Sequence, residues 1–275
     1  MWIKKSELEG LSADVKRLIA GEDIDVRDNR EGLLPILKND IHTLAAFKKE
    51  QVSVLQAERE VLKDTLADIS HQLKTPLTSM MIMADLLEEA PPPKQAEFLA
   101  NIKISLQRTE WLVSVLLKLA KLDAGTVPFR KENISSSQLI EAALSPLKIQ
   151  LEIKRQEIEI DGEELIACDK GWTAEALGNV IKNASEHSPA GSIINIQAGA
   201  NPICKWIAVQ DKGIGLEKSQ IKKLFNRFEA SSNLKGHGIG LPLALTIMRS
   251  QAGDIIVEGG GKGVGATFTL KFYKD

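Results

Sequence analysis

The 275-residue sequence has little of several residue types that would point to particular classes of protein. It has only two cysteines, Cys168 and Cys204, and their spacing fits no common metal-binding motif. We expect them to be buried, reduced thiols, as in cytosolic proteins, with a disulfide as the alternative. Aromatic residues make up only 4% of the chain, so its cores must consist mainly of Leu, Ile, Val and Ala.

Neither a strong excess of charge nor a long hydrophobic run is present. The net charge of −2 gives no electrostatic reason to expect binding to nucleic acid or to a membrane surface. No stretch approaches the roughly 20 apolar residues of a membrane span, and residues 1–10 lack the apolar core of a signal peptide. The chain as given is therefore expected to be soluble, which leaves open a membrane segment ahead of it in the natural protein.

Two long helical patterns dominate the first half. From Ile41 onward, apolar residues recur at spacings of three, four or seven, which is typical of a coiled coil, and this seam stops at the prolines of 91–93. A second pattern runs from Phe98 to Leu119 and ends near Gly125, a suitable C-cap. These patterns predict an antiparallel hairpin whose apolar face pairs with a second copy, giving a homodimeric four-helix bundle. Ahead of them, residues 21–32 are expected to form a loop between two short amphipathic helices.

After residue 126 the pattern changes to short alternating segments. Strands are predicted at 127–134, 157–161, 165–169, 192–200, 205–211, 254–260 and 265–273. Helices are predicted at 136–154, 172–187 and 239–251. The second half is therefore expected to be an α/β domain of about 150 residues, a common domain size.

His71, the only histidine in residues 51–124, lies in the first long helical pattern, five residues before Pro76. A neutral imidazole is a good nucleophile near pH 7. Proline removes one helical hydrogen bond and its ring clashes with the carbonyl of Gln72, so we expect a bend there that presents or withdraws the histidine. The ordinary alternative is an exposed histidine without a function, beside an unrelated proline. Only the motifs in the second half of the chain argue against this alternative.

That second half contains three glycine-rich stretches, at 210–216, 235–244 and 261–270. Such loops let the backbone approach a ligand and expose N–H groups to anionic oxygens, although each one alone is often an ordinary turn. Asn179 and Asn183 lie on one helix face and carry oxygens suited to Mg²⁺. Asp211 follows an apolar strand, where a carboxylate can accept a hydrogen bond from adenine.

These residues carry a close resemblance to one family. "ISHQLKTPLT" resembles the H-box of sensor histidine kinases, and "GNVIKNA", "DKGIGL", "KKLFNRF", "GHGIGL" and "GVGATFTL" resemble its N-box, first glycine box, F-box, second glycine box and third glycine box. The order and spacing match over about residues 55–272. The implied fold is a long-helix hairpin forming a dimeric four-helix bundle, followed by an α/β two-layer sandwich of the histidine-kinase and gyrase-type (GHKL) ATPase fold. The implied domains are an N-terminal relay segment at 1–50, a dimerisation and phosphotransfer domain at 51–124, and a catalytic ATP-binding domain at 125–275.

The resemblance also implies the chemistry and its residues. His71 would accept the γ-phosphoryl group of ATP and pass it to an aspartate of a response regulator receiver domain, and Thr75 would orient water for dephosphorylating that regulator. Residues 217–237 would form a mobile lid anchored by Phe225 and Phe228, and a hinge near 122–125 would let the ATP domain reach His71. Asn183 would hold Mg²⁺. The residues implied to bind the nucleotide are Asn179, Asn183, His187, Asp211, Gly213, Gly215, Phe228, Gly236, Gly238, Gly240, Gly265 and Thr267.

Three positions depart from the family pattern. Gln72 stands where an acidic residue usually accepts the second imidazole proton, Glu186 replaces a basic residue, and Ala230 replaces an arginine. We expect Arg227 or Lys235 to supply the missing positive charge near the γ-phosphate. Gln72 can orient the ring but cannot take a proton.

The resemblance bears on location and leaves alternatives. "DNREGLLPILKNDI" faintly resembles the second helix of a HAMP relay module, which implies the cytoplasmic part of an inner- or plasma-membrane sensor; a plain coiled-coil lead-in is the alternative. Two other functions remain open at this point. One is a dimeric phosphotransfer scaffold with an inactive nucleotide domain, and the other is a gyrase-type ATPase clamp that hydrolyses ATP without labelling itself.

Overall fold

The computed structural model describes residues 5–28, 30–228, 238–259 and 264–274, in two compact units of residues 1–67 and 68–275. In the first unit, helix α1 (Lys5–Ile19) and a loop precede helix α2 (Leu33–Glu89), which continues into the second unit. Leu11 of α1, Val26 of the loop and Leu34 of α2 are buried. The predicted loop is confirmed, but the predicted short helix after it is wrong, because Leu33 already begins the 57-residue helix α2.

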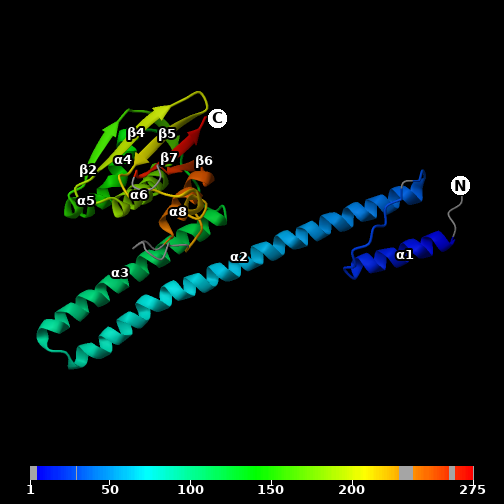
Figure 1. The fold of residues 1–275 in the computed structure, drawn as a ribbon, viewed down its shortest axis with the longest axis horizontal. Helices are drawn as coiled ribbons and strands as arrows, with labels where there is room; N and C mark the ends of the chain where they lie inside the picture. Colours follow the sequence, from blue (N-terminus) through cyan, green and yellow to red (C-terminus); the bar gives the residue numbers. More distant parts are fainter. Residues whose placement is uncertain (1–4, 29, 229–237, 260–263, 275) are drawn as a thin grey trace. The chain divides into compact units, whose positions relative to one another are not determined.

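A helical hairpin opens the second unit (Figure 1). Helix α2 ends at Glu89, Ala90 and Pro91 form the turn, and helix α3 runs from Pro92 to Asp123. The predicted hairpin is therefore confirmed. Helix α2 continues through Pro76, and the bend predicted there stays a prediction. Among the described helices, none combines the length and apolarity that a bilayer crossing needs.

The α/β domain is built on two sheets. A small antiparallel pair consists of β1 (Glu132–Ser135) and β3 (Leu165–Cys168). The larger sheet has the order β2-β4-β5-β7-β6, in which only β2 and β4 are parallel. Its strands are β2 (Glu157–Asp161), β4 (Ile193–Ala200), β5 (Cys204–Gln210), β6 (Gly253–Gly259) and β7 (Ala266–Tyr273). Strand β7 lies inside the sheet and pairs with both β5 and β6.

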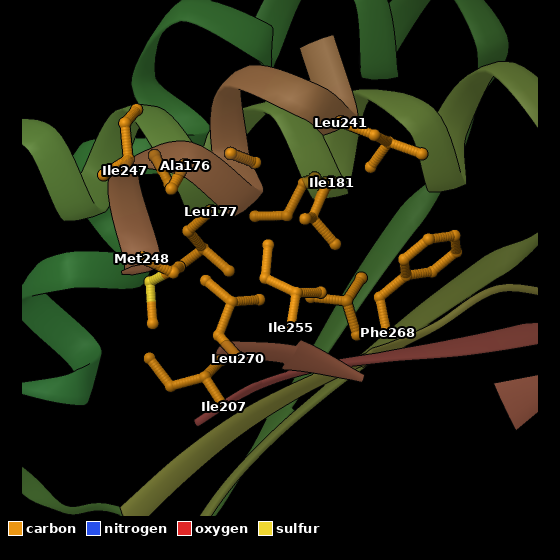
Figure 2. Packing of buried hydrophobic residues seen from close by; sticks show 14 of the residues in the cluster. Ala176, Leu177, Ile181, Ile207, Leu241, Ile247, Met248, Ile255, Phe268 and Leu270 are labelled. Atoms are coloured by element: carbon orange, nitrogen blue, oxygen red, sulfur yellow. The ribbon is translucent and has the colours of Figure 1, made fainter. Parts of the chain in front are cut away.

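One layer of helices covers one face of the larger sheet (Figure 1). It contains α4 (Ser136–Leu144), α6 (Lys170–His187) and α8 (Gly240–Ser250), and the short helices η1 (Ser145–Leu147), α5 (Lys148–Lys154) and α7 (Lys218–Ile221) complete the domain. Figure 2 shows Leu177 and Ile181 of α6 beside the strand residues Ile255, Phe268 and Leu270. All five are buried, because alternate strand residues face the helices while their neighbours face outward. The predicted two-layer sandwich is thus confirmed.

Strand β1 and the two cysteines are features of this domain that the sequence also predicts. The strand predicted at 127–134 begins only at Glu132, because the ladder with β3 extends from Glu132 to Ser135 and gives the preceding residues no partner strand. Cys168 and Cys204 are both free and buried, so the reduced thiols are confirmed.

Helix α3 contacts the α/β domain through its second half. The apolar side chains Leu112, Val115, Leu119 and Leu122 are buried in the same cluster as the core of the domain. Polar contacts flank them: Lys118 Nζ donates to Glu175 of α6 at 2.5 Å, and Lys182 lies 5.3 Å from the ring centroid of Trp111. The hairpin is therefore docked on the helical layer through both apolar and charged groups.

Candidate active site

His71 is exposed on helix α2, where it is accessible to another domain. Thr75, one turn further along the helix, donates its hydroxyl to the His71 carbonyl oxygen at 3.1 Å. Gln72 is half-buried, and the neighbouring Leu73 packs against the core cluster, so the helix presents His71 while its adjacent face is fixed. This arrangement suits a surface nucleophile whose backbone is held in place.

Asp211 follows strand β5 and is the centre of the second cluster. Its side chain is only 4% exposed. The backbone N–H of Asp211 donates to Ala266 O at 3.0 Å, and its Oδ1 accepts the N–H of Gly213 at 2.8 Å. Burial raises the pKa of the Asp211 carboxyl, and the hydrogen bonds from Gly213 and Ala266 oppose part of that rise. A carboxylate kept here against a desolvation cost is typical of a binding site.

Glycines surround Asp211 because side chains would not fit. A Cβ on Gly213 would lie 2.6 Å from the His187 carbonyl oxygen. Gly265 has a positive φ of 80°, and a Cβ there would lie 2.0 Å from the Asp211 carbonyl oxygen. The first and third glycine stretches therefore meet at Asp211, although they are far apart in the sequence.

Helix α6 forms the opposite side of the cluster. Asn179 Nδ2 donates to the Glu175 carbonyl at 3.0 Å, and a Cβ on Gly240 would lie 2.9 Å from Asn179 Oδ1, so the second glycine stretch also approaches this helix. Asn183 and His187 follow at four-residue intervals and are half-buried. Burial lowers the pKa of His187, which favours the neutral imidazole near neutral pH.

The remaining predicted residues are placed as follows. Gly215 and Gly238 have positive φ values of 75° and 65°. Phe228, packed against the core cluster, donates its N–H to Gly238 O at 3.1 Å. Thr267 pairs with Gln210 in the sheet, and strand alternation puts its side chain on the face away from buried Phe268. Residues 229–237, the second part of the predicted lid with Ala230, Lys235 and Gly236, lie outside the described residues.

Arg227 has a partner that the sequence did not indicate. Its Nη2 contacts both carboxylate oxygens of Asp123, at 2.9 Å each, at the end of helix α3. In this arrangement the Arg227 guanidinium is paired with Asp123, and the expectation that Arg227 or Lys235 supplies positive charge near the γ-phosphate stays a prediction. The two residues are 104 positions apart, which is why no local pattern could reveal the pair.

Close to this ion pair lies a cavity of about 460 Å³. Its lining includes Leu122 and Asp123 of α3, Phe225 and Arg227, and the α8 residues Pro242, Leu245, Thr246, Arg249 and Ser250. Asp211 and the asparagines of α6 are not among these lining residues. The cavity therefore belongs to the docking of α3 on α8 rather than to the Asp211 cluster.

Two family models match the chain, and they coincide with the two sites. Residues 61–125, which include His71, match the His Kinase A (phospho-acceptor) domain. Residues 168–275, which include Asn183 and Asp211, match the histidine kinase-, DNA gyrase B- and HSP90-like ATPase. The chain belongs to the sensor histidine kinase family. The exposed His71 lies within the residues that match the phospho-acceptor domain, and the glycine-lined Asp211 lies within those that match the ATPase.

Curated sensor kinases are similar to the chain along most of its length. It is 29% identical to the sensor histidine kinase WalK of Bacillus subtilis over 82% of the chain, and 25% identical to the kinase BaeS of Escherichia coli over 90%. These alignments cover 38% of WalK and 55% of BaeS, so the chain spans about half the length of the relatives it matches.

Solved structures of sensor kinases share the fold. The histidine kinase AdeS of Acinetobacter baumannii has a TM-score of 0.60 at 20% identity, over 74% of this chain and 97% of that one. The kinase ThkA, solved in complex with the response regulator TrrA, has a TM-score of 0.66 at 16% identity, over 83% of this chain and 66% of that one. Hairpin and α/β domain are thus found together in related sensor kinases.

Proposed function

We propose that this chain uses ATP to phosphorylate His71 and then passes the phosphoryl group to an aspartate of a response regulator. The observation that carries the proposal is the presence, in one chain, of an exposed histidine on a helical hairpin and a buried aspartate where two glycine stretches meet, beside a helix that a third glycine stretch approaches. The names of the curated relatives and the solved ThkA complex with TrrA support both steps.

The Asp211 cluster has the chemistry that an adenine nucleotide needs. Asp211 Oδ1 is already occupied by the Gly213 N–H, so we expect Oδ2 to accept from the exocyclic amine of adenine. A Cβ would collide with other parts of the same chain at Gly213, Gly240 and Gly265. The backbone of these loops can therefore approach a ligand closely. The related structure of ShkA was solved in complex with AMPPNP, which supports a nucleotide at the corresponding domain.

The α6 asparagines fit a divalent cation beside the phosphates. Asn183 presents a hard amide oxygen suited to Mg²⁺, and Asn179 beside it is fixed by its bond to Glu175. The cation, when bound, neutralises phosphate charge. The rest of the work falls to the protein, since phosphoryl transfer depends on positioning and charge compensation more than on covalent help.

In the proposed step, a ring nitrogen of His71 attacks the γ-phosphorus in line with the departing ADP oxygen. The N–P bond forms as the bond from that oxygen to phosphorus breaks, and the second imidazole proton is released. Gln72 can hold the ring through its amide but offers no carboxylate for that proton. Docked helix α3 must allow the ATP domain to bring the nucleotide to His71, and we propose a hinge at 122–125 for this movement.

The proposed assembly is a homodimer. Leu55, Leu62, Leu66 and Leu77 of the α2 seam are exposed in the single chain, and a second hairpin would bury them in a four-helix bundle.

Sensor kinase relatives such as BaeS and VanS of Enterococcus faecium support placing this chain in the cytoplasmic part of a membrane sensor. Residues 1–50 would then serve as its relay segment, ahead of phosphotransfer and catalytic domains at 51–124 and 125–275.

Incubation with γ-labelled ATP and Mg²⁺ tests the proposal. Phosphohistidine is labile in acid and stable in base, so the expected product is a labelled chain with that pattern. Hydrolysis of ATP without labelling would identify a gyrase-type clamp instead. Absence of both labelling and ATP binding would identify a phosphotransfer scaffold with an inactive nucleotide domain.

Thr75→Ala is expected to separate the two activities proposed for the hairpin. The Thr75 hydroxyl lies on the same face as His71, one turn away, and we propose that it orients water at the regulator's phospho-aspartate. The variant should keep self-labelling and slow dephosphorylation of a phosphorylated regulator. Thr75→Ser retains the hydroxyl and is the matched control. Equal loss of both activities in Thr75→Ala would indicate a damaged helix rather than a lost water-orienting group.

Gln72→Glu is expected to speed self-labelling. Attack by the ring nitrogen builds positive charge on the imidazole, and a neighbouring carboxylate would stabilise that charge and accept the proton. General-base help is typically worth about 10²- to 10⁴-fold, so the wild type should be slow and its rate should rise with pH as solvent takes over. The variant should flatten this pH profile without changing ATP affinity. An unchanged rate and profile would show that domain closure, not proton removal, is the slow step.

A further inference from the structure

Side chains from outside the Asp211 cluster hold the C-terminal end of helix α6. The last carbonyls of any helix lack partners within the helix. Here Lys154 Nζ donates to Ser185 O at 2.5 Å and lies 3.3 Å from Glu186 O and 3.4 Å from Ser188 O. A lysine cation at this end also opposes the negative pole of the helix dipole.

Gln156 completes the same set of contacts from a buried position. Its Nε2 lies 3.2 Å from Ser185 O, 3.3 Å from Ser188 O and 3.0 Å from Pro189 O, which share its two hydrogens. Its Oε1 accepts the Ser185 hydroxyl at 2.6 Å. Gln156 Nε2 also lies 3.4 Å from Ser192 Oγ, so this amide, which is only 7% exposed, contacts the end of α6 and the turn that follows it.

The other side of that segment touches the glycine turn after Asp211. Ser188 Oγ accepts the Lys212 N–H at 3.3 Å. The His187 carbonyl lies so close to Gly213 that a Cβ there would approach it to 2.6 Å. Residues 185–188 therefore stand between the Lys154 and Gln156 side chains and the loop that positions the Asp211 carboxylate.

We infer that Lys154 and Gln156 are positioning residues for nucleotide binding, acting through the end of α6. The inference rests on the proposed function, because it assigns the two residues to the same ATP site. Both residues belong to the turn between helix α5 and strand β2. Helix α5 ends at Lys154, Arg155 takes a left-handed φ of 52°, and strand β2 begins at Glu157. This turn aims Lys154 and Gln156 at α6 together, so they hold Ser188 and the His187 carbonyl against the Lys212–Gly213 backbone.

Substitutions at Lys154 test the inference on the full chain. Lys154→Met keeps the apolar stem and removes the donor, and we expect it to weaken Mg²⁺–ATP binding by about tenfold in calorimetry, since small misplacements of binding groups are costly. Lys154→Arg keeps several donors and should restore most of the affinity. Lys148→Met, an exposed lysine on the first turn of the same helix, is the matched control and should bind as the wild type does.

The kinetics of self-labelling provide the second measurement. Lys154→Met should raise KM for ATP and leave kcat near the wild-type value, because His71 and its neighbours are untouched. Gln156→Glu, which removes both donor hydrogens at constant size, should raise KM in the same way. If it fails to fold, the Lys154 variants decide the question alone.

The outcomes separate this inference from the proposed function. A wild type that binds no ATP would overturn the proposed function. Wild-type and Lys154→Met proteins that bind ATP equally well, measured well below both melting temperatures, would overturn only the inference. A lower melting temperature of Lys154→Met with unchanged ATP affinity would also overturn the inference, because it would show that these contacts stabilise the fold without affecting nucleotide binding.

Discussion

His71→Gln is expected to abolish self-labelling while leaving ATP affinity near that of the wild type. Glutamine keeps a polar side chain on the helix surface but has no nucleophilic ring nitrogen. His71 is exposed, and the residues that surround Asp211 belong to the α/β domain, so the substitution does not touch the nucleotide site. The measurement is incorporation of γ-labelled phosphate, with calorimetry for Mg²⁺–ATP on the same preparation.

His42→Gln is the matched control for this experiment. His42 is also on helix α2, so the control removes a histidine from the same helix. It should retain the label, because the neighbourhood of His71 is unchanged. Persistent labelling of His71→Gln, with His187 or another residue carrying the phosphate, would contradict the assignment of the nucleophile.

Asp211→Asn is expected to weaken ATP binding strongly. The amide keeps the size of the side chain, and its oxygen can still accept the Gly213 N–H. It loses the carboxylate that would accept from the adenine amine. A hydrogen bond to a charged group is typically worth about 1.5–3 kcal/mol, so affinity should fall by roughly 10- to 150-fold. Calorimetry checks this, and unchanged affinity would mean that adenine binds elsewhere.

The same variant should not destabilise the protein without nucleotide. Burial raises the pKa of Asp211 above its ordinary value of 3.8, so the folded protein holds this proton more tightly than the unfolded chain. The carboxylate therefore costs stability as pH rises through that raised pKa, and the cost persists at neutral pH. Asp211→Asn removes the cost and should raise or preserve the melting temperature at pH 7. Asp161→Asn, at an exposed position ending β2, is the control and should change neither property.

The sequence predicted most of the fold and the centre of the site because both depend on local patterns. Strand alternation located β4, β5 and β7, and the glycine stretches marked the loops that approach Asp211 and Asn179. Glycine is informative here because it occupies positions where any Cβ would collide with neighbouring atoms, and each glycine can be read directly from the sequence.

Contacts between distant segments could not be predicted in this way. Lys154 and Gln156 lie about 30 residues from the carbonyls they bind, and nothing in their own neighbourhood identifies those acceptors. The Asp123–Arg227 pair depends on how helix α3 docks on the domain. Strand β1 was predicted five residues too long at its start, because only pairing with β3 sets its length. In each instance the tertiary partner, rather than the local pattern, determines the outcome.

The interior place of strand β7 has a consequence for how the protein is made. Residues 266–273 bridge β5 and β6, and Ala266 supplies the carbonyl that binds the Asp211 N–H. During synthesis the ribosome must therefore release these residues before the sheet can close and the nucleotide site can form. The helical hairpin, complete at Asp123, has no such dependence. Nascent chains are thus expected to display His71, the proposed phosphoacceptor, well before they can bind the nucleotide proposed to modify it.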